Sequence, residues 1–334
     1  MTIRERQERE EEARLSPYAA LSSRSAGRAH PISVCDLRTC YQRDRDRIIH
    51  CKSFRRLKYK TQVFLTPMGD HYRTRLTHTL EVSQVARTLA RSLRLNEDLT
   101  EAAALGHDLG HTPFGHIGES TLNRLLPGGF RHNEQSLRVA ERLENDGAGL
   151  NLCRETLDGI LNHSGQTEPK TLEGWCVRRA DRIAYINHDI DDAIRGGILK
   201  PFELPRRCLS VLGETHGERI DTMIRDIVTT SADQPFVRMS AEVQQASDEL
   251  RAFLFEYVYH DEWRKKEEAR CDYILTALYE HYLAHPEQLP AEYLEINFTE
   301  GAERAVCDFI ACMTDRYAID QFSEIFVPGA FGRR

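Results

Sequence analysis

The stretch Leu76-Thr-His-Thr-Leu-Glu-Val-Ser-Gln-Val-Ala-Arg-Thr-Leu-Ala-Arg-Ser-Leu-Arg-Leu95 carries the strongest fold signal in this chain of 334 residues. Its apolar residues recur three and four positions apart, which is typical of an α-helix with one buried face. His78 precedes Val82 by four residues and Val85 by seven, so its imidazole is expected to project from that buried face. The pattern predicts a helix over 76–95 with a histidine directed into the core.

A second helix is predicted over 99–110. Asn96 and Asp98 are typical start signals, and Gly110 suits a C-terminal cap. This helix places His107 and Asp108 in its last turn. Imidazole nitrogen together with carboxylate oxygen suits a divalent cation such as Mn, Fe, Mg or Zn.

The density of titratable side chains here favours a functional site over a structural core. A buried histidine or a lone His-Asp pair is more often part of the core. In this chain, however, His111, His116 and Glu119 follow the pair closely. So many ionisable groups on the inner side of a helix would make a poor core, because burying a charge is costly.

Length and composition limit the class of protein. A chain of this size can bury a large core, and a net charge of −7 argues against general coating of nucleic acid. No apolar run approaches the eighteen residues typical of a membrane span, and the N-terminus lacks a signal-peptide pattern. Nine scattered cysteines without a Cys-x-x-Cys pair indicate reduced thiols. Location in the cytoplasm, without a membrane partner, is expected.

A basic stretch over 38–60 is open to three interpretations. Its arginines and lysines alternate with Tyr41, Phe54 and Tyr59. The stretch could form a wall that binds phosphates, or a groove in which single-stranded nucleic acid stacks on aromatic rings. It could equally be a helix whose charges pair with neighbouring acids such as Asp44 and Asp46.

Two further spacings carry candidate chemistry. Glu119 lies one turn after His116, so the carboxylate could orient the imidazole for general acid catalysis or form an ordinary intrahelical hydrogen bond. Asp181, Tyr185 and Asp189 form one strip of a predicted helix. Both carboxylates could serve one cation, or one could bind metal and the other a polar group.

The remaining chain is predicted to be mostly helical, with no strand-rich region. Residues 1–35 are expected to form an N-terminal arm that is largely irregular, and residues 66–72 a turn or short hairpin. A boundary follows Gly196-Gly197. Beyond it, helices are predicted over 217–230, 240–259, 262–285 and 300–325. The predicted fold class is all-α, with a helical core over 36–200 and a C-terminal helical region over 201–334 packed on that core.

Several sequence runs together resemble the HD-domain deoxynucleoside triphosphate triphosphohydrolases, the dGTPase-like family. The matching runs, which cover roughly 16–200, are Tyr41–His50, Phe54–Val63, Arg73–Glu81, His107–Glu119, His132–Ser136 and Ala180–Asp189. The resemblance implies that 36–200 is an HD-domain catalytic core. It also implies metal-dependent hydrolysis of dGTP or several dNTPs to deoxynucleoside and inorganic triphosphate.

The resemblance assigns a role to each candidate residue. One divalent metal ion (Mn, Mg, Fe, Co or Ni) would be held by four ligands: His78, His107, Asp108 and Asp181. Catalysis would fall to His116 and Glu119. The phosphates would be bound by Arg75, His111, His132 and Arg182. The nucleoside would be contacted by Gln62, Tyr185 and Asp189, the last two near the sugar 3′-hydroxyl. For Arg75 a surface salt bridge is the alternative.

The resemblance also implies a homo-oligomer, and activation by a second nucleotide or by single-stranded DNA. Two other functions remain open. One is an HD-type nucleotide monophosphatase or phosphodiesterase, which would use the same metal ligands. The other is a non-catalytic regulator that binds nucleotides or nucleic acid.

Overall fold

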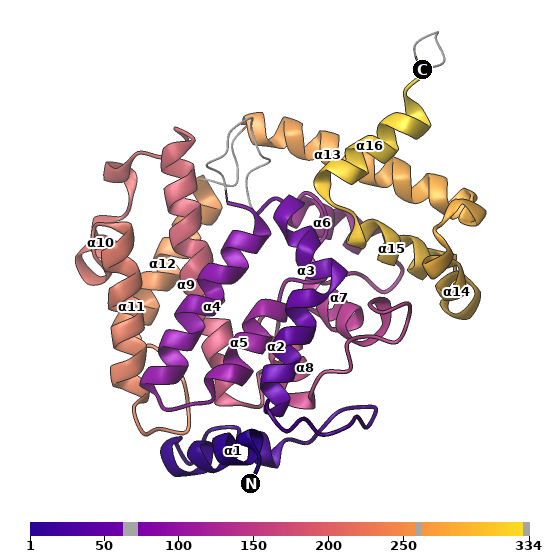
Figure 1. Cartoon of the computed structure of the whole chain (residues 1–334). Coiled ribbons are helices and arrows are strands. Elements are labelled where there is room, and N and C mark those ends of the chain that lie inside the picture. Colours follow the sequence, from indigo (N-terminus) through magenta and orange to yellow (C-terminus); the bar gives the residue numbers. More distant parts are fainter. Residues whose placement is uncertain (63–72, 258–261, 330–334) are drawn as a thin grey trace.

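Helices alone build the described part of this protein, which a computed structural model presents over residues 1–62, 73–257 and 262–329 (Figure 1). These ranges contain sixteen α-helices and no β-strand; extended pairing is limited to isolated bridges between Arg28 and Cys153 and between Thr61 and Thr74. The predicted all-α fold class is confirmed. The turn predicted over 66–72 lies outside the described residues.

Three helices form the centre of the fold: α4 (Arg75–Ser92), α5 (Glu97–Gly106) and α9 (Leu172–Arg195). The apolar face of α4 is buried against α9, with Val82 and Leu89 fully inaccessible to solvent. Asn96 caps α5 by accepting a hydrogen bond from the backbone N–H of Leu99 at 3.2 Å. The helix predicted from the 76–95 periodicity is therefore present with slightly shifted ends.

The second predicted helix ends four residues earlier than expected. Helix α5 stops at Gly106, and residues 107–110 form a turn, so His107 and Asp108 follow the helix instead of lying in its last turn. The glycine at position 110 is explained by close packing and not by capping. A Cβ there would lie 2.2 Å from the backbone of Gln135, so only glycine allows the two chain segments to approach this closely.

Five helices surround this centre on the side of the turn. They are α2 (Cys40–His50), α3 (Lys52–Arg56), α6 (His116–Leu125), α7 (His132–Arg138) and α8 (Arg154–Asn162). A second apolar cluster joins α2, α5 and α8 through Ile48, Leu105 and Ile160.

The basic stretch 38–60 is only partly ion-paired. Arg38 contacts Asp46 at 2.6 Å, and Arg45 lies 3.2 Å from Asp46 and 3.6 Å from Asp98. Arg47 and the buried Lys60 instead donate to backbone carbonyls. Pairing with neighbouring acids therefore accounts for part of the stretch only.

The N-terminal segment is more ordered than the predicted arm. Residues Ile3–Arg14 form helix α1, which starts with a capping box between Thr2 and Glu5. No side chain of α1 is buried, so the helix is held by capping and by surface ion pairs such as that between Arg4 and Glu8. After α1, only a short 3-10 turn at Ser22–Arg24 interrupts the irregular path to α2.

The C-terminal region divides into two groups of helices that flank the centre on opposite sides (Figure 1). The first group packs with α4 and α9, and the second packs with α6. The first comprises α10 (Arg206–Leu212), α11 (His216–Ser231) and α12 (Ala241–Tyr257). The second comprises α13 (Glu262–Ala284), α14 (Ala291–Glu300), α15 (Ala302–Cys312) and α16 (Asp315–Phe326).

The single helix predicted over 300–325 is therefore wrong, since Thr314 caps α16 as a new helix. Helices α10 and α14 were not predicted. None of the described helices combines the length and the apolar character needed to cross a membrane.

Candidate active site

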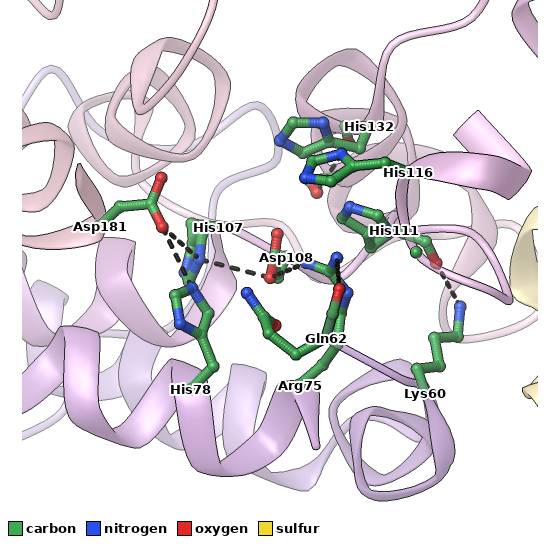
Figure 2. A network of polar contacts seen from close by, with 12 residues as sticks. Lys60, Gln62, Arg75, His78, His107, Asp108, His111, His116, His132 and Asp181 are labelled. Atoms are coloured by element: carbon green, nitrogen blue, oxygen red, sulfur yellow. Dashed lines mark hydrogen bonds and ion pairs between the residues drawn. The ribbon is translucent and has the colours of Figure 1, made fainter. Parts of the chain in front are cut away.

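Four of the predicted ligand side chains converge between α4, α9 and the turn after α5 (Figure 2). Nε2 of His78 lies 3.1 Å from Oδ1 of Asp181. Nε2 of His107 lies 3.5 Å from Oδ2 of Asp108 and 3.9 Å from Oδ1 of Asp181. The donor atoms of His78, His107 and Asp108 all lie within 4.8 Å of one another, and Asp181 lies beside the two histidines of this cluster.

This cluster fits one divalent cation. Nδ1 of His107 donates to the backbone carbonyl of Ala104 at 2.6 Å, so its Nε2 presents a lone pair to the cluster. That Nε2 atom is buried and has no hydrogen-bond partner within the described ranges. A buried polar atom usually has a partner, and two imidazole nitrogens with two carboxylate oxygens form a suitable donor set for a transition metal.

Both carboxylates are held in the ionised form that a metal ligand requires. Burial alone would raise the pKa of Asp108, but the Arg75 guanidinium and nearby imidazoles keep that pKa well below its usual range. Nη1 of Arg75 lies 2.6 Å from Oδ2 of Asp108. Burial likewise opposes ionisation of Asp181, but the hydrogen bond with His78 and the other nearby imidazoles together lower the pKa of Asp181.

His188 lies beside His78, and its sequence position alone indicated no role for it. Nδ1 of His188 is 3.5 Å from Nδ1 of His78, and Nε2 of His188 is 3.0 Å from Oε2 of Glu81. Burial lowers the pKa of His188 to about 2, so its ring is neutral. The only sequence signal was its position next to Asp189 in the run Ala180–Asp189.

On the opposite side of Asp108, three histidines surround Glu119. His132 donates from Nδ1 to Oε1 of Glu119 at 2.9 Å, whereas Nδ1 of His116 lies 3.7 Å from Oε2. The ring of His111 stacks on that of His132 with centroids 5.0 Å apart. Glu119 is therefore shared, and its closer partner is His132 instead of the predicted His116.

The charges in this group follow from burial and from Glu119. Burial would raise the pKa of Glu119, but its interactions with His116 and His132 lower it strongly. Burial opposes a charge on His132, and the Glu119 carboxylate outweighs it, so the pKa of His132 is raised. The pKa of His111 falls well below its usual value because the ring is buried beside Arg75.

A tight turn presents His116 as the first residue of α6. Phe114 and Gly115 both have positive φ, 61° and 62°, which is unusual for a phenylalanine. The backbone N–H of Phe114 donates to Oδ1 of Asp315 at 2.9 Å. The side chain of His116 is 64% exposed, so the turn leaves this imidazole open to a ligand.

The C-terminal helices reach this turn through two contacts that no local sequence signal revealed. The Asp315 carboxylate also accepts the backbone N–H of Thr61 at 2.9 Å. Lys60 donates from Nζ to the carbonyl of His111 and, at 2.8 Å, to that of Ala311. Burial lowers the pKa of Lys60 to about 8.

The other predicted substrate residues fall into two groups. Gln62 and Arg75 are buried beside Asp108, and Nη2 of Arg75 donates to the Gln62 carbonyl at 3.2 Å (Figure 2). Arg75 is therefore not the surface salt bridge given as its alternative.

The second group follows Asp181 along α9. Arg182 forms an ion pair with Asp248 of α12, away from the cluster. Tyr185 is partly buried, which raises its pKa to about 12, and Asp189 is buried.

His163 also lies beside the candidate site. This residue follows the last residue of α8 and is buried. Its Nε2 lies 3.2 Å from Nε2 of His132, and its ring contacts that of His107 at 4.9 Å between centroids. Its position after an apolar run at a helix end gave no sign of these neighbours.

Comparisons with known proteins found two matching domain families and relatives that align over nearly the whole chain. The HD domain family matches residues 75–186, and the phosphohydrolase-associated domain family matches residues 237–324. A "deoxyguanosinetriphosphate triphosphohydrolase-like protein" of Caldanaerobacter subterraneus subsp. tengcongensis is 58% identical, over 98% of this chain and 97% of its own length. A protein of Clostridium perfringens with the same name is 50% identical, over 98% of each chain. A third, from Desulfatibacillum aliphaticivorans, is 48% identical over 98% of this chain and 99% of its own.

Proposed function

This chain belongs to the deoxyguanosinetriphosphate triphosphohydrolase-like family, and we propose that it hydrolyses deoxynucleoside triphosphates to deoxynucleoside and inorganic triphosphate. The observation that carries the proposal is the donor cluster of His78, His107, Asp108 and Asp181 with Arg75 at its edge. These four side chains would hold one divalent cation, with Mn, Mg, Fe, Co and Ni as the candidates. When bound, such a cation polarises a phosphoryl oxygen and makes water a better nucleophile.

Three buried polar atoms beside the cluster support a phosphate-containing ligand. Nε of Arg75, Nε2 of His111 and Oε1 of Gln62 are buried and lack hydrogen-bond partners within the described ranges. Each would otherwise carry a desolvation cost of about 1–3 kcal/mol. An arginine fork matches the oxygens of a phosphate, so Arg75 and His111 would bind the phosphates and Gln62 the nucleoside side of the ligand.

His116 is proposed to protonate the leaving 5′-oxygen. Its imidazole is exposed at the start of α6 and lies 3.7 Å from Glu119, whose carboxylate can orient the ring. Glu119 also holds His132, whose raised pKa supplies positive charge for the triphosphate. A positioned general acid typically accelerates a reaction by about 10²–10⁴-fold.

Helix α9 would contact the sugar. Tyr185 and Asp189 lie one and two turns beyond Asp181, and the hydroxyl and carboxylate would together recognise a 3′-hydroxyl. A tyrosine beneath the furanose leaves little room for a 2′-hydroxyl, which favours deoxyribose. Arg182 would exchange its partner Asp248 for a phosphate.

Two further features are proposed from the family resemblance alone. They are a homo-oligomeric state and activation by a second nucleotide or by single-stranded DNA. Location in the cytoplasm is proposed from the scattered cysteines and from the lack of a signal-peptide pattern.

Product analysis tests the proposed function. Purified protein would be incubated with each dNTP and Mn²⁺ or Mg²⁺, singly and mixed, and the products separated by chromatography. We expect deoxynucleoside and tripolyphosphate in equal amounts, and none from an Asp181→Asn control, which loses one metal ligand. Orthophosphate as the product would favour the monophosphatase or phosphodiesterase alternative, and binding without turnover would favour a regulator.

A further inference from the structure

The ring of His78 is held between two side chains of α9. Its Nε2 lies 3.1 Å from Oδ1 of Asp181, and its Nδ1 lies 3.5 Å from Nδ1 of His188. Asp181 and His188 are separated by about two turns of α9, so both project from the same face of that helix. The two histidines are buried and meet edge to face, with ring centroids 5.7 Å apart. One nitrogen of His78 therefore faces the donor cluster, and the other faces His188.

Metal binding by His78 would determine where the proton of each ring lies. A neutral imidazole carries its proton on one nitrogen and a lone pair on the other. If Nε2 of His78 binds a cation, Nδ1 carries the proton and needs an acceptor, because a buried N–H without a partner is costly. Nδ1 of His188 is the only hydrogen-bonding partner of that atom among the residues that the structure describes. His188 must then accept at Nδ1 and carry its own proton on Nε2.

Glu81 lies where that second proton would point. Its Oε2 is 3.0 Å from Nε2 of His188, and this buried oxygen has no aligned hydrogen bond within the described ranges. Arg73 holds the carboxylate, with Nε 3.3 Å from Oε2 and 3.4 Å from Oε1. Arg73 is itself fixed to α9 by Asp191 and Asp192, at 3.0 and 2.9 Å. A carboxylate, an imidazole and the ligand imidazole thus follow one another in a row.

The other histidine ligand is oriented in a different way. Nδ1 of His107 contacts the backbone carbonyl of Ala104, in the turn that precedes it, at 2.6 Å. Its orientation is therefore set within its own segment. The orientation of His78 depends instead on the packing of α4 against α9, with Glu81 one turn after His78 on the same face of α4.

We propose that His188 is a positioning residue for His78 and that Glu81 acts through it. The inference rests on the proposed function, because it takes His78 as a ligand of the cation. Nε2 of His188 donates towards Glu81, Nδ1 of His78 donates to His188, and Nε2 of His78 directs its lone pair at the cation. The carboxylate polarises both rings in the same direction, which makes His78 a stronger ligand.

Mn²⁺ binding to the full-length protein without nucleotide tests the role of His188. Electron paramagnetic resonance of free Mn²⁺ gives the dissociation constant. His188→Leu removes the acceptor behind His78, and loss of such a partner typically weakens metal binding by about 10–100-fold. His188→Asn keeps an acceptor oxygen near the position of Nδ1, so its dissociation constant should lie closer to that of the wild type. Glu81→Gln keeps an oxygen but removes the charge, and should weaken binding less than His188→Leu.

Ile190→Val is the matched control for packing. Ile190 is fully buried two residues further along α9 and belongs to the core between α4 and α9. This variant should bind Mn²⁺ as the wild type does. Unchanged binding in His188→Leu would overturn the proposal. An equal loss in His188→Leu, His188→Asn and Ile190→Val would overturn it as well, because only the packing of α9 would then matter.

Nuclear magnetic resonance of the wild type tests the proposal even if His188→Leu does not fold. Long-range ¹H–¹⁵N spectra of histidine rings distinguish the two tautomers, and Zn²⁺ is a diamagnetic substitute for Mn²⁺. With Zn²⁺ bound, we expect the proton on Nδ1 of His78 and on Nε2 of His188, with the His188 signals assigned by their loss in His188→Asn. A proton on Nδ1 of His188 would contradict the proposal, since that nitrogen could not accept.

Failure of this proposal can be told apart from failure of the proposed function. Tight Mn²⁺ binding that is independent of residue 188 would contradict only the role of His188. The expected order of affinities without dNTP hydrolysis would contradict only the proposed reaction. A wild type that binds no Mn²⁺ would overturn both.

Discussion

Nη1 of Arg75 lies 2.6 Å from Oδ2 of Asp108, and both side chains are buried. This ion pair joins a proposed phosphate-binding residue to a proposed metal ligand. The guanidinium keeps Asp108 ionised by lowering its pKa, and it is itself held beside the position that a phosphate would occupy. Metal binding and phosphate binding are therefore coupled through one contact.

Arg75→Met is expected to destabilise the metal-free protein by about 3–5 kcal/mol, because Asp108 is left buried without its closest counter-charge. Added Mn²⁺ would replace that charge, so it should raise the melting temperature of the variant more than that of the wild type. Thermal unfolding with and without Mn²⁺ measures the rise in melting temperature for both proteins. Equal shifts for the two proteins would show that Arg75 does not support the carboxylate.

His116→Ala is expected to lower kcat by about 10²–10⁴-fold while leaving Mn²⁺ affinity unchanged. The imidazole is exposed and contacts none of the four proposed metal ligands, so its removal should affect proton transfer alone. Steady-state kinetics measure kcat, and a Mn²⁺ titration measures the affinity for the metal. His50→Ala is the control for the loss of an exposed histidine. Full activity in His116→Ala would reject its role as general acid.

Asp315→Ala is expected to reduce kcat although residue 315 lies outside the HD domain match. Its carboxylate accepts the backbone N–H groups of Phe114 and Thr61, and each orphaned group costs about 1–3 kcal/mol. The turn that presents His116 would loosen, whereas Mn²⁺ affinity should stay within about threefold. Asp320→Ala on the exposed side of α16 is the matched control. Unchanged kcat in Asp315→Ala would show that the C-terminal helices do not position the turn.

Lys60 is expected to make the free energy of unfolding rise with pH. Its pKa falls from 10.5 to about 8 in the folded protein because it is buried. Below pH 8 the lysine is charged in both states, and the cost of burying that charge is present in full. Between about 8 and 10.5 the unfolded chain binds more protons, so the free energy of unfolding rises with pH.

This contribution should amount to about 3 kcal/mol, the free energy that corresponds to a lowering of the Lys60 pKa from 10.5 to about 8. Urea unfolding of wild type and Lys60→Met across this pH range measures it, with Lys58→Met as the exposed control. The stability advantage of Lys60→Met should shrink as pH rises; a constant difference would contradict the buried, titrating lysine.

The sequence predicted the features that depend on local spacing. The periodicity around His78 specified a helix with its histidine on the buried face, and α4 has that form. The 107–119 run indicated a dense group of ionisable residues, and these belong to two neighbouring clusters, one with His107 and Asp108 and one with His111, His116 and Glu119. The family resemblance supplied Asp181, which no local pattern could select over Asp189.

Features that depend on contacts between distant segments could not be predicted. Glu119 pairs with His132 because the loop between α6 and α7 returns the chain to the same point, 13 residues later. Asp315 and Thr61 meet across 254 residues of sequence. Gly110 was interpreted as a helix cap, although the close approach of Gln135 explains it. In each case the deciding neighbour lies on another element.

Hydrolysis in ¹⁸O-labelled water tests the central claim most directly. If the cluster around Asp108 directs water to the α-phosphorus and His116 protonates the 5′-oxygen, mass spectrometry should find one ¹⁸O atom in the tripolyphosphate and none in the deoxynucleoside. Label in the deoxynucleoside, or release of labelled orthophosphate in place of tripolyphosphate, would contradict the account.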